Sequence, residues 1–282
     1  MIEDKASRTA LRVAMRRAAH QILDDPKVLD DPIALPILPV EAERRLREGT
    51  DEWQTPSERA LRAFMVARSR YAEDRLAAAV HNGARQFVVL GAGLDTYAYR
   101  NPSPSLRVFE VDHPATQEWK RKQLERSGIA IPEGVQFVPI DFERQTLQEG
   151  LAGAGFLLRP VSFFSWLGVT QYLTRDAVLA TLRFIACTGP GSGVVFDYSV
   201  PRASLGPIEQ IALDDLMERV ARAGEPFRHF FDPPELDALL REIGFREIED
   251  LGPAEINQRY FQNRRDGLRI VLGLGRLASA AT

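Results

Sequence analysis

Two glycines and an acid stand where a bound nucleoside would need them. Gly91 and Gly93 follow an apolar run at 87–90, and Asp112 ends the next predicted strand, 19 residues after Gly93. Glycine lets a backbone turn tightly and lets a ligand approach closely, because it has no Cβ. A carboxylate at this spacing accepts hydrogen bonds from both hydroxyls of a ribose. The pattern predicts a nucleoside site, although a lone Gly-x-Gly is also common in plain turns and an acid before a helix can be its cap.

A third acid extends this pattern. Asp141 ends the third predicted strand and is followed by Phe142. An acid accepts a hydrogen bond from the exocyclic amine of adenine, and an aromatic ring stacks on the base. Glu110 lies two positions before Asp112 on the same strand face, and we expect it to sit too deep to be the ribose ligand. A dinucleotide and a nucleoside without phosphate both fit these features.

Residues 95 and 96 distinguish the two ligand classes. A dinucleotide site has the motif Gly-x-Gly-x-x-Gly, whose third glycine lets the helix pack closely. Thr96 occupies that position here. Asp95 would repel a pyrophosphate approaching the same loop. S-adenosylmethionine has no phosphate and carries a sulfonium and an ammonium group, so a carboxylate at position 95 suits it. The sequence favours this methyl donor over a nicotinamide cofactor.

The elements that must position these residues alternate between strand and helix. Short runs of β-branched and aromatic residues predict five strands, at 86–93, 105–112, 135–141, 161–168 and 191–199. Helical segments lie between them, and Thr174 is the predicted N-cap of one. Two later runs, at 246–252 and 267–277, have no long helix between them and predict an antiparallel pair. The fold class is therefore α/β: a doubly wound, Rossmann-like, mixed sheet of seven strands, which binds ligands at the carboxyl ends of its strands.

The first 83 residues predict a helical cover. Helical periodicity marks 8–23 and 57–80, and the proline-rich segment at 24–40 predicts irregular structure between them. We expect the basic face of the first helix to be exposed to solvent. The chain is accordingly divided into a cover at 1–83 and a nucleoside-binding domain at 84–282.

Composition narrows the function classes. Of 282 residues, 36 are basic and 39 acidic, so the net charge of -3 gives no general attraction to nucleic acid or to an anionic membrane. Nowhere do about 18 apolar residues run uninterrupted, and the sequence predicts a cytoplasmic protein. The single cysteine, Cys187, reads as a small buried hydrophobe. No cluster of cysteine and histidine has the spacing of a metal site, so we expect no metal.

Several segments, in the same order along the chain, resemble the bacterial branch of the leucine carboxyl methyltransferase family, which includes tetracenomycin-type polyketide O-methyltransferases. They are SRTALRVAMRRAAH, FVVLGAGLDTYAYR, VFEVDHPATQEWKRKQL, FVPIDF, WLGVTQYLT and residues 231–269. The resemblance implies a class I fold that uses S-adenosyl-L-methionine. It also implies donor-binding roles for Arg68 toward the carboxylate, Gly91 and Gly93 in the first loop, Asp112 at the ribose, and Asp141 and Phe142 at the adenine.

One position departs from the resemblance. Relatives with the motif EGLxxYL carry a glutamate near the methionine part of the donor, where this sequence has Leu167. The ammonium of the donor must then find backbone carbonyls or another acid, and Asp95 is a candidate.

The acceptor decides whether a base is needed. A carboxylate is ionised at pH 7, whereas a phenol with a pKa near 10 is about 3 units short of ionisation. His229 is the candidate base and Tyr172 a candidate hydrogen-bond partner of the acceptor, although both could be ordinary packing residues. Trp166 and Tyr198 are expected to give the pocket an aromatic wall.

The predicted function is O-methylation of a hydroxyl or carboxylate on a small-molecule acceptor, of polyketide or aromatic type. The alternatives are methylation of a protein C-terminal carboxyl group and a non-catalytic scaffold that binds the donor. The expected partner is the small-molecule acceptor, and we expect binding to neither nucleic acid nor a membrane. The sequence is compatible with a homodimer.

Overall fold

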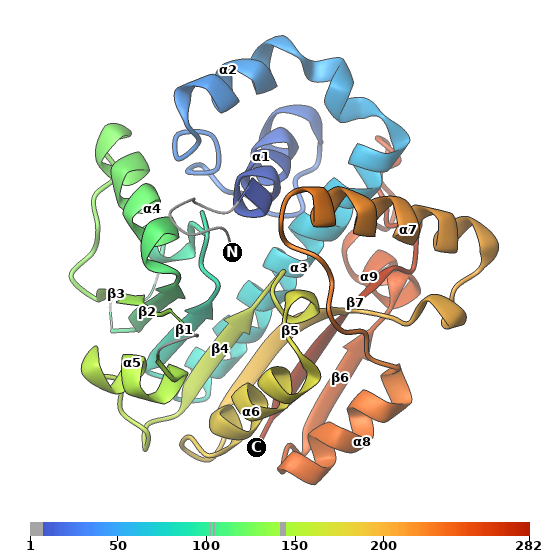
Figure 1. Ribbon diagram of the computed structural model, residues 1–282. Coiled ribbons are helices and arrows are strands. Elements are labelled where there is room, and N and C mark those ends of the chain that lie inside the picture. Colours follow the sequence, from blue (N-terminus) through green and yellow to red (C-terminus); the bar gives the residue numbers. More distant parts are fainter. Residues whose placement is uncertain (1–7, 102, 104, 142–144) are drawn as a thin grey trace.

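The central feature is a mixed β-sheet. The computed structural model describes residues 8–101, 103, 105–141 and 145–282, and seven strands in these ranges form one sheet in the order β3-β2-β1-β4-β5-β7-β6 (Figure 1). The strands are β1 Gln86–Leu90, β2 Arg107–Asp112, β3 Val135–Pro139, β4 Ser162–Trp166, β5 Gly193–Ser199, β6 Glu247–Leu251 and β7 Gly275–Ala281. The first five are parallel to one another, and β7 runs antiparallel to both β5 and β6. The predicted fold class is confirmed.

The last strand begins later than predicted. The apolar run from 267 to 274 has no regular structure, although Leu268 and Ile270 within it are buried. The strand itself consists mainly of small residues, which let β7 lie between β5 and β6. A short helix, α9 Pro253–Tyr260, precedes it. An irregular segment can bury apolar side chains as well as a strand can. The hydrophobic pattern alone therefore predicted the start of β7 too early in the chain.

Helices cover both faces of the sheet. On one face α3 Pro56–His81 packs with α9 against the side chains of Phe87 and Val89. On the other face lie α5 Leu147–Gly153, α6 Arg175–Ala186, α7 Pro207–Arg222 and α8 Pro233–Ile243. The N-cap of α6 is Thr174, as predicted, whose hydroxyl accepts from the backbone N–H of Ala177 at 3.3 Å. Helix α7 is not among the helices predicted from the sequence.

The cover lies above the carboxyl ends of the strands (Figure 1). It consists of α1 Arg8–Leu23, α2 Val40–Glu48 and a short 3-10 helix, Thr50–Gln54, and its apolar cluster includes Leu124 of α4 Pro114–Arg126. The expected solvent exposure of the basic face of α1 is met by Arg8 and Arg12 and is wrong for Arg16 and Arg17. Arg16 and Arg17 are buried because each has a carboxylate partner, Glu58 and Asp31 respectively.

Two smaller expectations are also corrected. Cys187 is exposed, because it follows the last residue of α6 and caps the helix at the surface. Trp166 and Tyr198 belong to the apolar core, where each is 2% exposed, and so do not form a pocket wall. None of the helices in the described part of the chain is both long and apolar enough to cross a bilayer.

Candidate functional site

The loop after β1 is packed between two other segments. Gly91 and Gly93 have positive φ angles of 69° and 46°. A Cβ at Gly91 would lie 2.4 Å from Cγ2 of Val169 in the loop after β4, and one at Gly93 would lie 3.1 Å from Cβ of Ala10 on α1. The loop therefore needs glycine for its backbone and for the space around it. Both predicted glycines line the point where the sheet order reverses, between β1 and β4.

Asp112 lies at the end of β2, directly beside this loop. Its Oδ2 accepts from the N–H of Gly93 at 2.6 Å and its Oδ1 from the N–H of His113 at 2.7 Å. Burial raises the pKa of the Asp112 carboxyl, and the two backbone donors oppose that shift. His113, not Asp112, caps α4, since its Nδ1 accepts from the N–H of Ala115. The capping alternative for Asp112 is thereby removed, and its role at the ribose stays a prediction.

The other predicted acids are placed as follows. Asp141 is half-buried and follows β3, whereas Phe142 lies outside the described residues. Glu110 is fully buried, and its Oε2 lies 2.8 Å from both Nζ of Lys120 and the hydroxyl of Tyr99. Glu110 is thus deep in the protein, as expected, and neutralised by a lysine.

Asp95 faces the cover. Its Oδ1 accepts from the N–H of Tyr97 at 2.9 Å, and its Oδ2 lies 3.7 Å from Nη1 of Arg17. The neighbouring Thr96 donates to Asp31 at 2.7 Å. The residue that replaces the third glycine of a dinucleotide motif therefore holds the cover onto the loop.

Arg68 is paired with Asp197, an acid that is not among the predicted site residues. Its Nη1 donates to Oδ2 of Asp197 on β5 at 2.8 Å, and both side chains are 5% exposed. Oδ1 of Asp197 accepts from the N–H of Gly168, which follows β4. A signal existed in the sequence: an acid inside the apolar run VVFDY must be paired if the strand is buried.

The acceptor candidates lie near the ends of β4 and β5. The ring of Tyr172 meets that of Phe227 at 5.3 Å, and burial raises the Tyr172 pKa to about 12. The segment that carries His229 is held there, since the N–H of Arg228 donates to the carbonyl of Gln171 and that of Phe231 to the carbonyl of Ser199.

His229 itself packs edge-on against Phe231, with ring centroids 4.4 Å apart. Its Nε2 is buried and has no hydrogen-bond partner among the described residues. Burial lowers the His229 pKa, as does the nearby charge of Arg175. The imidazole is therefore neutral at pH 7 and able to accept a proton, but no described contact joins His229 to Tyr172.

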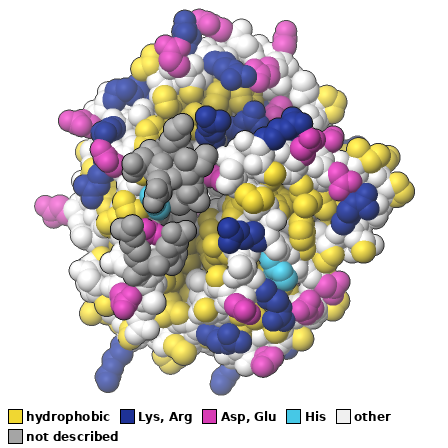
Figure 2. All heavy atoms as spheres, in the orientation of Figure 1, with side chains coloured by type: hydrophobic (Ala, Val, Ile, Leu, Met, Phe, Trp, Pro, Cys, Tyr) yellow, Lys and Arg dark blue, Asp and Glu magenta, His cyan; other side chains and the backbone are white. Residues whose placement is uncertain are grey.

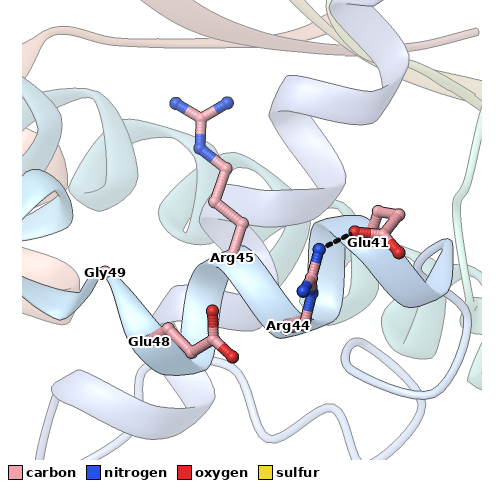
Figure 3. A pocket seen from close by; sticks show the side chains of 5 residues that line it. All are labelled: Glu41, Arg44, Arg45, Glu48 and Gly49. Atoms are coloured by element: carbon pink, nitrogen blue, oxygen red, sulfur yellow. Dashed lines mark hydrogen bonds and ion pairs between the residues drawn. The ribbon is translucent and has the colours of Figure 1, made fainter.

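Of two hollows in the described structure, one lies at this site and one lies away from it. The larger, of about 510 Å³, is a surface groove along α2 lined by Glu41, Arg44 and Arg45, and none of the predicted site residues borders it (Figure 3). The smaller, of about 10 Å³, has Glu73, Asp95 and Leu167 in its lining and lies at the site. The smaller hollow belongs to the site because Asp95 and Leu167 line it.

A comparison with known protein families decides the family. The model of the family described as leucine carboxyl methyltransferase matches residues 10–186. The chain belongs to the leucine carboxyl methyltransferase family. Its relatives in Bacillus subtilis and Mycobacterium avium are both named "Putative S-adenosyl-L-methionine-dependent methyltransferase", the former with the addition YktD. The first is 33% identical over 95% of each chain, and the second 34% identical over 62% of this chain and 58% of the relative. This chain is an S-adenosylmethionine-dependent methyltransferase.

A solved structure supports the fold of the methyltransferase. The "putative methyltransferase" from Thermobifida fusca superposes with a TM-score of 0.60, at 16% identity over 100% of this chain and 96% of that one. The residues of the site also fit the donor. The glycines Gly91, Gly93 and Gly168 bring the loops after β1 and β4 close to α1 and Arg68, and we call these two loops the donor cradle. The carboxylate of Asp112 and the buried pair of Arg68 with Asp197 lie beside it.

Proposed function

We propose that the methyltransferase methylates an oxygen of a small aromatic acceptor, at a hydroxyl or a carboxylate. The observation that carries the proposal is the seating of α1 on the donor loop, where Ala10 would contact a Cβ at Gly93 at 3.1 Å. A helix in this position covers the donor loop. Aromatic rings lie near the ends of β4 and β5: Tyr172 meets Phe227 at 5.3 Å, and Phe227 meets Phe230 at 6.1 Å. Edge-to-face ring contacts suit a planar aromatic partner.

Each part of the site has a separate role in methyl transfer. S-adenosylmethionine supplies a methyl group on a sulfonium, which is already a good leaving group, so alignment and exclusion of water provide most of the catalysis. Asp112 holds the ribose, and the cover excludes water. His229, neutral and with a free Nε2 among the described residues, takes the proton of a phenol. A carboxylate acceptor needs no base, because it is ionised at pH 7.

The family description favours a second candidate, methylation of a protein C-terminal carboxyl group. That substrate is a chain end held in an open groove. The packing of α1 against Gly93 argues against such a groove at this edge of the sheet. Helix α7 exposes the apolar residues Ile208 and Ile211, and Figure 2 shows hydrophobic side chains on the side of the molecule where α7 lies, a surface open to a larger substrate.

A transfer assay with radiolabelled methyl donor separates the candidates. The panel contains phenols, aromatic carboxylic acids and peptides that end in leucine. We expect labelled product with a phenol or an aromatic acid. Turnover of the peptides alone would replace the small-molecule assignment with the protein one, and turnover of none of the three classes would contradict both.

A further inference from the structure

Arg68 and Asp197 form a buried ion pair beside the loop after β4. The two side chains come from α3 and β5 and meet at 2.8 Å, each 5% exposed. Among the described contacts of the guanidinium, Nη1 is the nitrogen that hydrogen-bonds. A buried pair of this kind costs much of its attraction in desolvation and is weak evidence for a purely stabilising role. The pair therefore invites a functional explanation.

The pair lies at the edge of the donor cradle. A Cβ at Gly168 would lie 2.8 Å from Nη2 of Arg68, so the guanidinium rests directly on the loop after β4. The next residue of that loop, Val169, contacts Gly91 of the loop after β1. Both charges thus border the crevice between β1 and β4, where the methionine part of a donor must lie if its ribose is at Asp112.

The strand register relates Asp197 to the position that departs from the family resemblance. Trp166 of β4 is paired with Phe196 of β5, so the next positions along both strands are 167 and 197. Leu167 is apolar and packs with the cluster on the α3 face. A carboxylate at 197 consequently lies one strand away from 167, at the same height and on the same side of the sheet.

The amino-acid end of the donor is a zwitterion, with a carboxylate and an ammonium on one carbon. We propose that Asp197 binds this ammonium, beside Arg68, to which the family resemblance already gives the carboxylate, so that Asp197 serves in place of an acid at position 167. In the present structure the two side chains satisfy each other. When the donor binds, its carboxylate faces Arg68 and its ammonium faces Asp197, so each side chain keeps an ionic partner.

Two other acids near the crevice are already committed to the cover network. Glu73 is bound by both terminal nitrogens of Arg100. Asp95 accepts from the N–H of Tyr97 and faces Arg17 at 3.7 Å. Arg17 and Arg100 both contact Asp31, so both belong to the network that joins the cover to the donor loop. Arg68 with Asp197 is the pair in which each member matches one end of the zwitterion.

The test compares two nucleosides by calorimetry with the full chain. S-adenosylhomocysteine carries the amino-acid end, and 5′-methylthioadenosine lacks it. We expect Asp197→Asn to weaken S-adenosylhomocysteine about 10- to 100-fold and to change 5′-methylthioadenosine less than about twofold. Asp237→Asn is the matched control, because it removes the same charge from an exposed pair with Arg241 on α8. Equal losses for both nucleosides, or no loss for either, would overturn the proposal.

A second variant tests the replacement of one acid by another. Leu167→Glu combined with Asp197→Asn should recover most of the affinity for S-adenosylhomocysteine, and a double variant no tighter than Asp197→Asn would refute the replacement. If Asp197→Asn does not fold because Arg68 loses its counter-ion, Arg68→Gln with Asp197→Asn removes both charges. The double variant is compared with Arg68→Gln alone. We expect it to bind S-adenosylhomocysteine more weakly than the single variant, with 5′-methylthioadenosine unchanged, and equal binding by the two variants would overturn the assignment of Asp197.

Discussion

The hydroxyl of Thr96 donates a hydrogen bond of 2.7 Å to Oδ2 of Asp31. The same carboxylate oxygen accepts from Nη2 of Arg17 at 2.6 Å, and Oδ1 lies 3.4 Å from Nε of Arg100. One buried carboxylate of the cover thereby joins α1 to the loop that carries the glycines. The architecture of the donor loop depends on residues far from it in the sequence.

Thr96→Gly would restore the glycine pattern of a dinucleotide site but remove this hydroxyl. We expect a loss of about 1–3 kcal/mol in the free energy of unfolding, because the buried carboxylate and guanidinium lose a partner. Urea denaturation measures the loss. Thr96→Ser keeps the hydroxyl and should stay close to wild type; a Thr96→Gly protein as stable as Thr96→Ser would remove Thr96 from the network.

Asp31→Asn should cost about 3–5 kcal/mol at pH 7, because it leaves Arg17 buried without its charge partner. Burial alone would raise the pKa of Asp31, but Arg17 and Arg100 hold it below its usual value. A depressed pKa in the folded state means that this contribution is present above about pH 4 and is lost as the pH falls through the folded pKa. Urea titrations at several pH values should show the gap to wild type narrowing below about pH 4; a gap that does not change with pH would contradict the assignment.

Gly91→Ala tests the contact between the two loops. The variant must fit a Cβ 2.4 Å from Val169 and adopt a φ of 69°. We expect a loss of about 1–3 kcal/mol in stability together with weaker binding of S-adenosylhomocysteine. Gly153→Ala is the control, since no atom lies within 4 Å of its Cβ. Val169→Ala in the Gly91→Ala background should restore the part of the loss that is steric, and an unchanged double variant would show that the backbone angle alone is responsible.

Asp112→Asn should weaken S-adenosylhomocysteine and 5′-methylthioadenosine alike, by about 10- to 100-fold. Both nucleosides carry the ribose, so a residue that binds its hydroxyls cannot distinguish them. Calorimetry on the two ligands therefore separates Asp112 from Asp197. Unaltered binding of both ligands would show that Asp112 serves only to hold the N–H groups of Gly93 and His113.

His229→Gln should lower kcat on a phenol acceptor and leave kcat on an aromatic carboxylic acid nearly unchanged. Burial lowers the His229 pKa, so the base form is present at neutral pH and is lost as the pH falls below the usual histidine value of about 6.5. The rate of phenol methylation in the wild type should therefore fall on the acidic side. Steady-state rates between pH 5 and 8 show whether this acidic limb disappears in the variant, as general-base catalysis requires.

The sequence predicted those parts of the site that depend on local order. Gly91 and Asp112 each end a strand, and the spacing of strand and helix placed them at one edge of the sheet. Arg17 and Asp197 were not predicted in their observed roles, because their partners are remote: Arg68 and Asp197 are 129 residues apart, and Arg17 and Thr96 are 79 apart. Periodicity shows which face of a helix is apolar, but it does not show which carboxylate will neutralise an arginine on that face.

The same distinction applies to the fold. Alternation of strands and helices identified the parallel part of the sheet, where each strand is a compact apolar run. The predicted start of β7 was wrong because the apolar residues Leu268 and Ile270 are buried in an irregular segment. The strand itself is built of small residues. For α7, Leu213 is the buried residue of the helix and Ile208 is 77% exposed, so its apolar residues do not mark one face.

The position of β7 has a consequence for the order in which the chain can fold. Residues 275–281 pair with 193–199 on one side and with 247–251 on the other. Until β7 arrives during synthesis, β5 is an unpaired edge, and the strand that carries Asp197 offers its free backbone groups to other chains. The sheet cannot close progressively from one end to the other. The gap between β5 and β6 is filled last, and Asp197 gains a fixed strand beside it only at that final step.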